Sequence, residues 1–68
     1  MDENKAKALK AQLEVAIEEE ASDAEKYMKM ADEADDKYAC ILRDIAHEEL
    51  THRKHLMAIH EDMTGMAE

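Results

Sequence analysis

The most polar internal stretch of the chain is Asp32-Glu33-Ala34-Asp35-Asp36-Lys37, and its conformation decides the fold. The sequence on either side is rich in helix-favouring residues, contains no proline and has a single glycine. Apolar residues recur every three or four positions before and after this stretch, as they do on one face of a helix. We predict an all-α fold of two amphipathic helices, over about residues 3–33 and 37–62, with Asp35 or Asp36 capping the second.

The apolar seam expected between the helices is formed by Leu9, Leu13, Ala16, Ile17, Ala24, Tyr27, Ala31 and Ala34 in the first and by Tyr38, Ile41, Leu42, Ile45, Leu56, Ile59 and Met63 in the second. Its spacing continues through the polar stretch without a break. One uninterrupted helix, roughly 90 Å long at 1.5 Å per residue, is therefore the alternative to a hairpin. An open dimer in which two copies exchange helices lies between these two arrangements. Gly65 marks the expected end of the second helix.

The chain has 68 residues, which allows a single domain over 1–68. Below roughly 70–80 residues one hydrophobic core rarely supplies enough stability, and disulfides, a metal or oligomerisation usually compensate. Cys40 is the only cysteine, so no disulfide forms within the chain. We interpret Cys40 as a small buried or half-buried apolar residue, which leaves metal binding, oligomerisation or both as the source of stability.

The formal net charge of −9 argues against binding to nucleic acid or to anionic membrane surfaces. No apolar run approaches the roughly 20 residues that a membrane-spanning helix needs. Residues 1–4, Met-Asp-Glu-Asn, lack the basic and apolar regions of a signal peptide. We therefore expect a cytoplasmic protein.

Charged residues occupy positions in the apolar seam that should be apolar. Glu20 lies between Ile17 and Ala24, and Glu49 and His52 share one face of the second helix because they are three residues apart. A buried carboxylate without compensation costs several kcal/mol or takes up a proton. Since lysines and arginines fall mainly on the outer faces, a metal ion is the simplest compensation.

Glu20 and Glu49 are equally distant from the Ala34–Asp35 junction, so a hairpin that reverses there brings both to the same height. Tyr27, two turns from Glu20, is expected to point into the same channel. Two hairpins together would supply two glutamates and two Glu-x-x-His pairs, enough for two divalent ions per dimer. Carboxylates and imidazoles suit iron or manganese, with zinc as a competitor. This reasoning favours the hairpin over the long helix.

Other side chains near the seam are weaker candidates. Glu48 is the alternative carboxylate ligand, and His55 is expected at the solvent edge rather than on a metal. His47 is expected to be exposed and His60 to lie at the rim. The methionines Met28, Met30, Met57 and Met63 are expected to fill the core or contacts between subunits.

Two segments, Glu20-Ala-Ser-Asp-Ala-Glu-Lys-Tyr27 and Ile45-Ala-His-Glu-Glu-Leu-Thr-His52, resemble the rubrerythrin branch of the ferritin-like superfamily. The resemblance implies that Glu20 is a terminal metal ligand, Glu49 bridges two metals and His52 is a terminal nitrogen ligand. It also implies that Tyr27 donates a hydrogen bond to the ligands. The chain resembles half of the usual domain, so the hairpin is expected to dimerise into a ferritin-like four-helix bundle.

The resemblance implies a di-iron oxidoreductase that reduces hydrogen peroxide or dioxygen, as a peroxidase or a ferroxidase. With a single cysteine the chain lacks the rubredoxin-like domain of typical rubrerythrins, so electrons would come from an external donor or from incoming Fe²⁺. Two alternatives remain open: a metal-binding or iron-storage subunit with little turnover, and a purely structural helical dimer.

Overall fold

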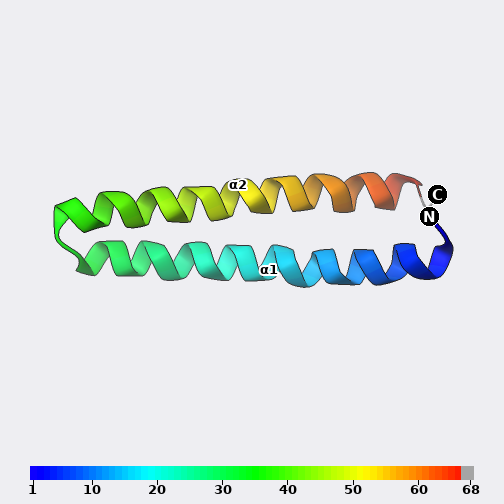
Figure 1. Ribbon diagram of the computed structural model, residues 1–68, viewed down its shortest axis with the longest axis horizontal. Coiled ribbons are helices and arrows are strands. Elements are labelled where there is room, and N and C mark those ends of the chain that lie inside the picture. Colours follow the sequence, from blue (N-terminus) through cyan, green and yellow to red (C-terminus); the bar gives the residue numbers. More distant parts are fainter. Residues whose placement is uncertain (67–68) are drawn as a thin grey trace.

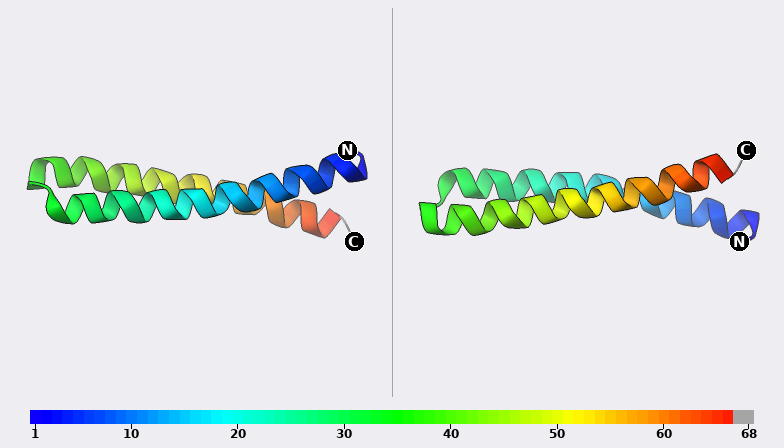
Figure 2. Two further views of the ribbon diagram at one scale, coloured as in Figure 1. Left: turned by 90° about the horizontal axis from the view of Figure 1, so that it is seen from below. Right: turned by 90° about the horizontal axis from the view of Figure 1, so that it is seen from above.

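The computed structural model describes residues 1–66 and consists of two antiparallel helices, α1 (Glu3–Glu33) and α2 (Asp36–Met66) (Figure 1). The two helices run side by side in opposite directions, and the start of α1 and the end of α2 lie at the end of the hairpin opposite the turn (Figure 1). They cross at a shallow angle, as the two perpendicular views show (Figure 2). The predicted all-α hairpin is thus confirmed, and the single long helix is excluded. No helix among residues 1–66 is long and apolar enough to cross a membrane.

The start of α1 is fixed by a side-chain cap. The Asp2 carboxylate accepts a hydrogen bond from the Lys5 backbone N–H at 2.8 Å, and the Asp2 backbone is extended. This contact satisfies one of the N–H groups that the first helical turn leaves without a partner. Glu3 follows in the first turn, where negative charge is favoured by the helix dipole.

The turn lies where the polar stretch predicted it. Ala34 leaves the helical conformation (φ −95°, ψ 160°), and its N–H still donates to the Ala31 carbonyl at 3.2 Å. The Asp35 carbonyl then accepts from the N–H groups of Tyr38 and Ala39, which begins α2. Among the described residues none has a positive φ, so this turn needs no glycine.

The second helix is longer than predicted. It continues past residue 62 to Met66 and includes Gly65, which does not adopt a positive φ and at which an added Cβ would meet open space. A glycine costs only about 1 kcal/mol in a helix interior, and less near a frayed end, so it does not stop α2. The expectation that the helix ends before Gly65 is wrong for this reason.

The core between the helices consists of one leucine and four alanines: Leu13, Ala24, Ala31, Ala39 and Ala46. Every seam residue predicted for α1 is buried or half-buried. In α2 the prediction is partly wrong, because Tyr38, Ile41 and Ile59 are 56%, 55% and 47% exposed. The line that α2 buries against α1 runs instead through Ala39 and Ala46, each one residue beyond a larger apolar side chain.

Candidate metal centre

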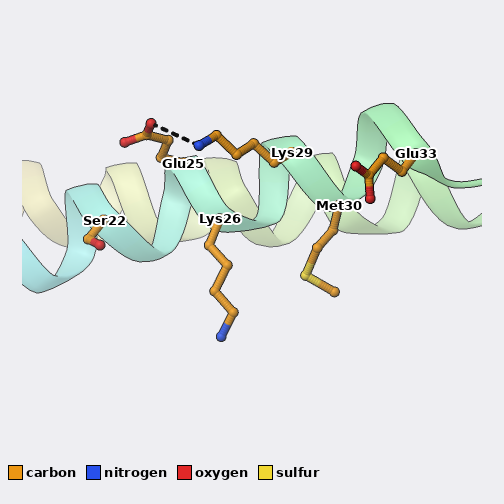
Figure 3. Close-up of a pocket in the computed structure, with 6 residues that line it drawn as sticks. All are labelled: Ser22, Glu25, Lys26, Lys29, Met30 and Glu33. Carbon is orange, nitrogen blue, oxygen red and sulfur yellow. Dashed lines mark ion pairs between the residues drawn. The ribbon is translucent and has the colours of Figure 1, made fainter.

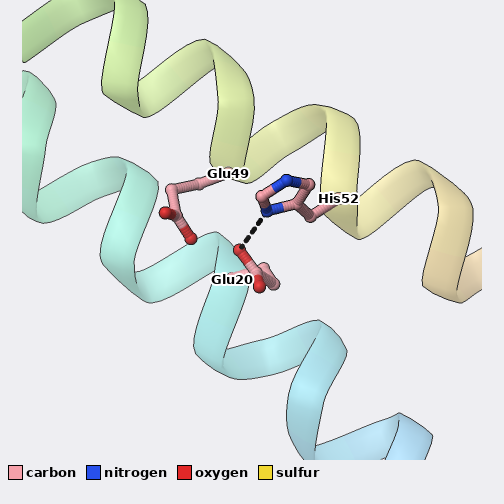
Figure 4. Close-up of side chains that lie close together, drawn as sticks. All are labelled: Glu20, Glu49 and His52. Carbon is pink, nitrogen blue, oxygen red and sulfur yellow. Dashed lines mark ion pairs between the residues drawn. The ribbon is translucent and has the colours of Figure 1, made fainter.

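Three side chains converge halfway along the hairpin: Glu20 from α1, and Glu49 and His52 from α2 (Figure 4). One ligand atom from each lies within 4.8 Å of the other two. The reversal at Ala34–Asp35 sets Glu20 opposite Glu49, and the three-residue spacing brings His52 to the same face. The structure thus brings together the three residues that the sequence predicted as metal ligands.

Glu20 is the most enclosed of the three. Its side chain is 23% exposed, and its Oε2 atom is buried without a hydrogen-bond partner among the described residues. His52 Nδ1 lies 3.9 Å from this oxygen, which is too long for a hydrogen bond. A buried carboxylate oxygen of this kind is costly, and a cation between Glu20 and His52 would satisfy it.

Glu20 perturbs the neighbouring Glu49 carboxyl group. A hydrogen bond with Glu20 raises the pKa of Glu49, and burial and the negative charge of Glu20 raise that pKa further. His52 acts in the opposite direction by lowering the pKa of Glu49. A raised pKa means that Glu49 takes up a proton at a higher pH than an isolated glutamate does. A divalent ion would replace that proton and leave both groups ionised.

The donor set fits a metal of the iron and manganese type. Two carboxylates and one imidazole offer hard oxygen ligands with one nitrogen, which suits these ions and also accepts zinc. One hairpin supplies only three ligand side chains, and the His52 side chain is 57% exposed at the open edge of the cluster. The ligand set within one hairpin therefore leaves room for further ligands on its exposed side.

The remaining predicted residues fall outside the cluster. Tyr27 is half-buried in the seam, and within residues 1–66 it makes no hydrogen bond to the three ligands, so its role stays a prediction. Glu48 and His55 are exposed and belong to no ligand group. His47 is exposed as expected.

Sequence reasoning missed or misjudged three side chains. His60 is half-buried at the edge of the seam, as expected for a rim residue, but its contact with Glu14 was missed: His60 Nε2 lies 3.0 Å from Glu14 Oε1. The Arg53 Nε atom is buried without a hydrogen-bond partner in the described part of the chain. Cys40 is exposed rather than buried, because it follows the buried Ala39 and so points off the seam.

A shallow hollow on the surface of α1 is lined by Ser22, Glu25, Lys26, Lys29, Met30 and Glu33 (Figure 3). All six side chains are exposed and come from one helix, and Lys29 pairs with Glu25 at 3.7 Å. No group of three metal-ligating side chains converges there. The hollow is thus an ordinary feature of a charged helix surface.

Comparison with known proteins gives one match. A family model described as Rubrerythrin matches residues 12–68, which include all three ligand candidates and Tyr27. No curated protein and no solved structure matches the chain.

Proposed function

The chain belongs to the rubrerythrin family, and from this premise and the geometry of Glu20, Glu49 and His52 we propose that it is a di-iron carboxylate oxidoreductase. The observation that carries the proposal is the convergence of three ligand atoms within 4.8 Å around a buried carboxylate oxygen that lacks a partner. The substrate of this oxidoreductase would be hydrogen peroxide or dioxygen.

The site becomes complete when two hairpins meet. Two copies contribute four carboxylates and two imidazoles, the set that ferritin-like di-iron and di-manganese proteins place on four facing helices. Four carboxylates balance the charge of two divalent ions. The small alanine-rich core of one hairpin supports this assembly, because a chain of this size needs an additional source of stability.

Each ligand side chain has a distinct task in this proposal. Glu20 is the enclosed carboxylate that holds one ion in place from α1. Glu49 would supply the carboxylate from α2, and the family resemblance implies that this is the carboxylate shared by two ions. His52 offers a neutral nitrogen ligand at the open edge. When bound, a pair of ferrous ions would supply the two electrons that reduce hydrogen peroxide to water.

Rapid mixing tests the proposal. Protein loaded anaerobically with Fe²⁺ is mixed with peroxide or with dioxygen, and iron oxidation is followed by absorbance. We expect oxidation at least about tenfold faster than for Fe²⁺ in buffer, and loss of that gain in Glu20→Gln. The matched control is Glu19→Gln, the exposed neighbour on the same helix. Tight iron binding with oxidation no faster than in buffer would contradict the oxidoreductase function and favour an iron-binding subunit with little turnover.

A further inference from the structure

A line of residues on α2, most of them large and apolar, borders the contact with α1 and is only partly covered by it. Tyr38, Ile45, His52 and Ile59 follow one another at seven-residue steps, which places them along one side of the helix. Tyr38 and Ile59 are 56% and 47% exposed, and the neighbouring Ile41 is 55% exposed. Ile45 is half-buried, so His52, a candidate ligand, lies in the middle of an apolar stripe that the hairpin itself covers only in part.

A second, mixed stripe follows α1 on the same side of the hairpin, in which Leu9 and Ala16 are half-buried and Asp23 and Met30 are exposed. Leu9, Ala16, Asp23 and Met30 also recur every seven residues, and Met30 precedes the buried Ala31 just as Tyr38 precedes the buried Ala39. Because the helices are antiparallel, residues that precede the buried line of each helix lie on the same side of the pair. Both stripes thus border one face, which we call the ligand face.

Both stripes are centred on the candidate ligands. In α2, Ile45 and Ile59 lie seven residues before and after His52. In α1, Leu9 and Met30 lie eleven residues before and ten after Glu20. A stripe with this symmetry is complementary to itself when a second copy is turned by 180° about the site, as a two-fold interface requires.

Two charged residues fit the same symmetry. Glu48 and His55 lie four residues before and three after His52, on the ligand face and close to the stripe. Both are exposed, and within residues 1–66 neither has an ion-pair or hydrogen-bond partner. If the α2 helices of two copies pack antiparallel and are centred near His52, Glu48 of each copy lies opposite His55 of the other copy. The two-fold symmetry therefore produces this pair two times.

We propose that a second copy covers the ligand face, with its α2 antiparallel to α2 and centred near His52. Ile45 of one copy then contacts Ile59 of the other, and Glu48 pairs with the other copy's His55 on both sides of the metal centre. This packing rests on the proposed function, in which two copies complete the metal site, and it adds the register in which the two α2 helices align. Glu48 and His55 are assigned to the interface rather than to the metal, and the exposed edge of His52 becomes enclosed.

The opposite side of the hairpin is the competing surface. Met28, Leu50 and Met57 are 41%, 41% and 43% exposed there. This side carries none of the three ligand candidates, so a copy docked on it would leave the ligand set incomplete. It therefore provides a matched control surface for the test.

Cross-linking measures the register directly. In a Cys40→Ser background, the variant with both Ile45→Cys and Ile59→Cys is treated with a short bismaleimide reagent in the absence of metal. We expect at least about ten times more covalent dimer than in either single variant, because equivalent residues of two copies would lie about 21 Å apart along the helix. The control pair, Leu50→Cys with Met57→Cys, should remain monomeric on denaturing gels. Equal cross-linking of the control pair would overturn the packing.

A charge exchange tests the polar pair independently. His55→Glu should place like charges opposite each other twice and raise the dimer dissociation constant about tenfold, measured by sedimentation without metal. Adding Glu48→Lys to His55→Glu should restore most of the affinity, and failure of that rescue contradicts the pairing. Iron content of the wild-type protein separates the two proposals. A dimer that binds iron but cross-links through the control pair overturns only the register, and a cross-linked dimer that binds no iron overturns only the proposed function.

Discussion

The two helices use their apolar residues differently. Half of the apolar face predicted for α1 is alanine, and all of its residues are buried or half-buried. α2 buries Ala39 and Ala46 against α1 and leaves Tyr38, Ile41 and Ile59 exposed. The contrast teaches that the closest contact within the hairpin relies on small residues, whereas three large residues of α2, Tyr38, Ile41 and Ile59, are exposed and available for a contact outside it.

The largest expected effect is on that outer contact. Replacing Ile45 and Ile59 together by Asp should weaken the proposed dimer at least about 100-fold, because each buried isoleucine contributes roughly 1.5–3 kcal/mol. Sedimentation measures the dissociation constant. The control, Leu50→Asp with Met57→Asp, should change it less than about threefold. A similar loss in both variants would remove the distinction between the two sides of α2.

The buried alanines provide the next test. Ala46 is 1% exposed, so Ala46→Leu should force the helices apart and cost about 1–3 kcal/mol of the free energy of unfolding. Urea denaturation at fixed protein concentration measures this cost. Ala58→Leu, at an exposed position of the same helix, is the matched control. If Ala46→Leu were neutral, close packing at this alanine would not stabilise the hairpin.

Glu49 should add to the stability of the metal-free protein as the pH falls through its raised pKa toward the ordinary pKa of a glutamate. The pKa of Glu49 is raised in the folded state, first by its hydrogen bond with Glu20, so the folded chain holds more protons than the unfolded chain between the ordinary and the raised value. The free energy of unfolding then increases as the pH falls through that interval. Iron affinity should move in the opposite direction, since protons compete with the metal.

Thermal unfolding of the metal-free protein across this pH range measures the effect. Glu49→Gln should lose the part of the pH dependence that Glu49 causes, whereas Glu48→Gln should keep it. Identical pH profiles in all three proteins would contradict the coupling between Glu20 and Glu49.

The smallest expected effect concerns the contact between Glu14 and His60 at the open end. The Glu14 side chain is 59% exposed, so the contact is largely screened by solvent. Glu14→Gln should lower the free energy of unfolding by less than about 1 kcal/mol, relative to Glu18→Gln on an exposed part of α1. A larger loss of the free energy of unfolding, measured by urea denaturation, would mean that this contact stabilises the hairpin more than a solvent-screened contact should.

The sequence predicted the fold well because the decisive signals are local. Helix-favouring composition and three- to four-residue spacing gave α1 its bounds, and the matched positions of Glu20 and Glu49 located the turn. The buried line of α2 was harder to predict, since its two adjacent apolar stripes merge into one pattern and only the partner helix decides between them. Ala39 and Ala46 were overlooked because alanine is a weak hydrophobic signal.

The candidate site was predictable for a related reason. Ionisable residues in an apolar seam stand out, and Glu20, Glu49 and His52 do so in a short sequence. The contact between Glu14 and His60 gave no such signal, because it joins residues 46 positions apart at the edge of the seam. Contacts of that kind depend on the crossing of the helices, which residue spacing alone does not determine.

Metal content after anaerobic loading tests the central claim most directly. Purified protein is loaded with Fe²⁺, freed of excess metal and analysed for iron per chain, alongside Glu49→Ala and the control Glu48→Ala. We expect one iron per chain, or two per dimer, in the wild type and in Glu48→Ala. Glu49→Ala should lose most of its iron, because it removes a carboxylate proposed to be shared by both ions. Equal iron content in the wild type and Glu49→Ala would contradict the assignment.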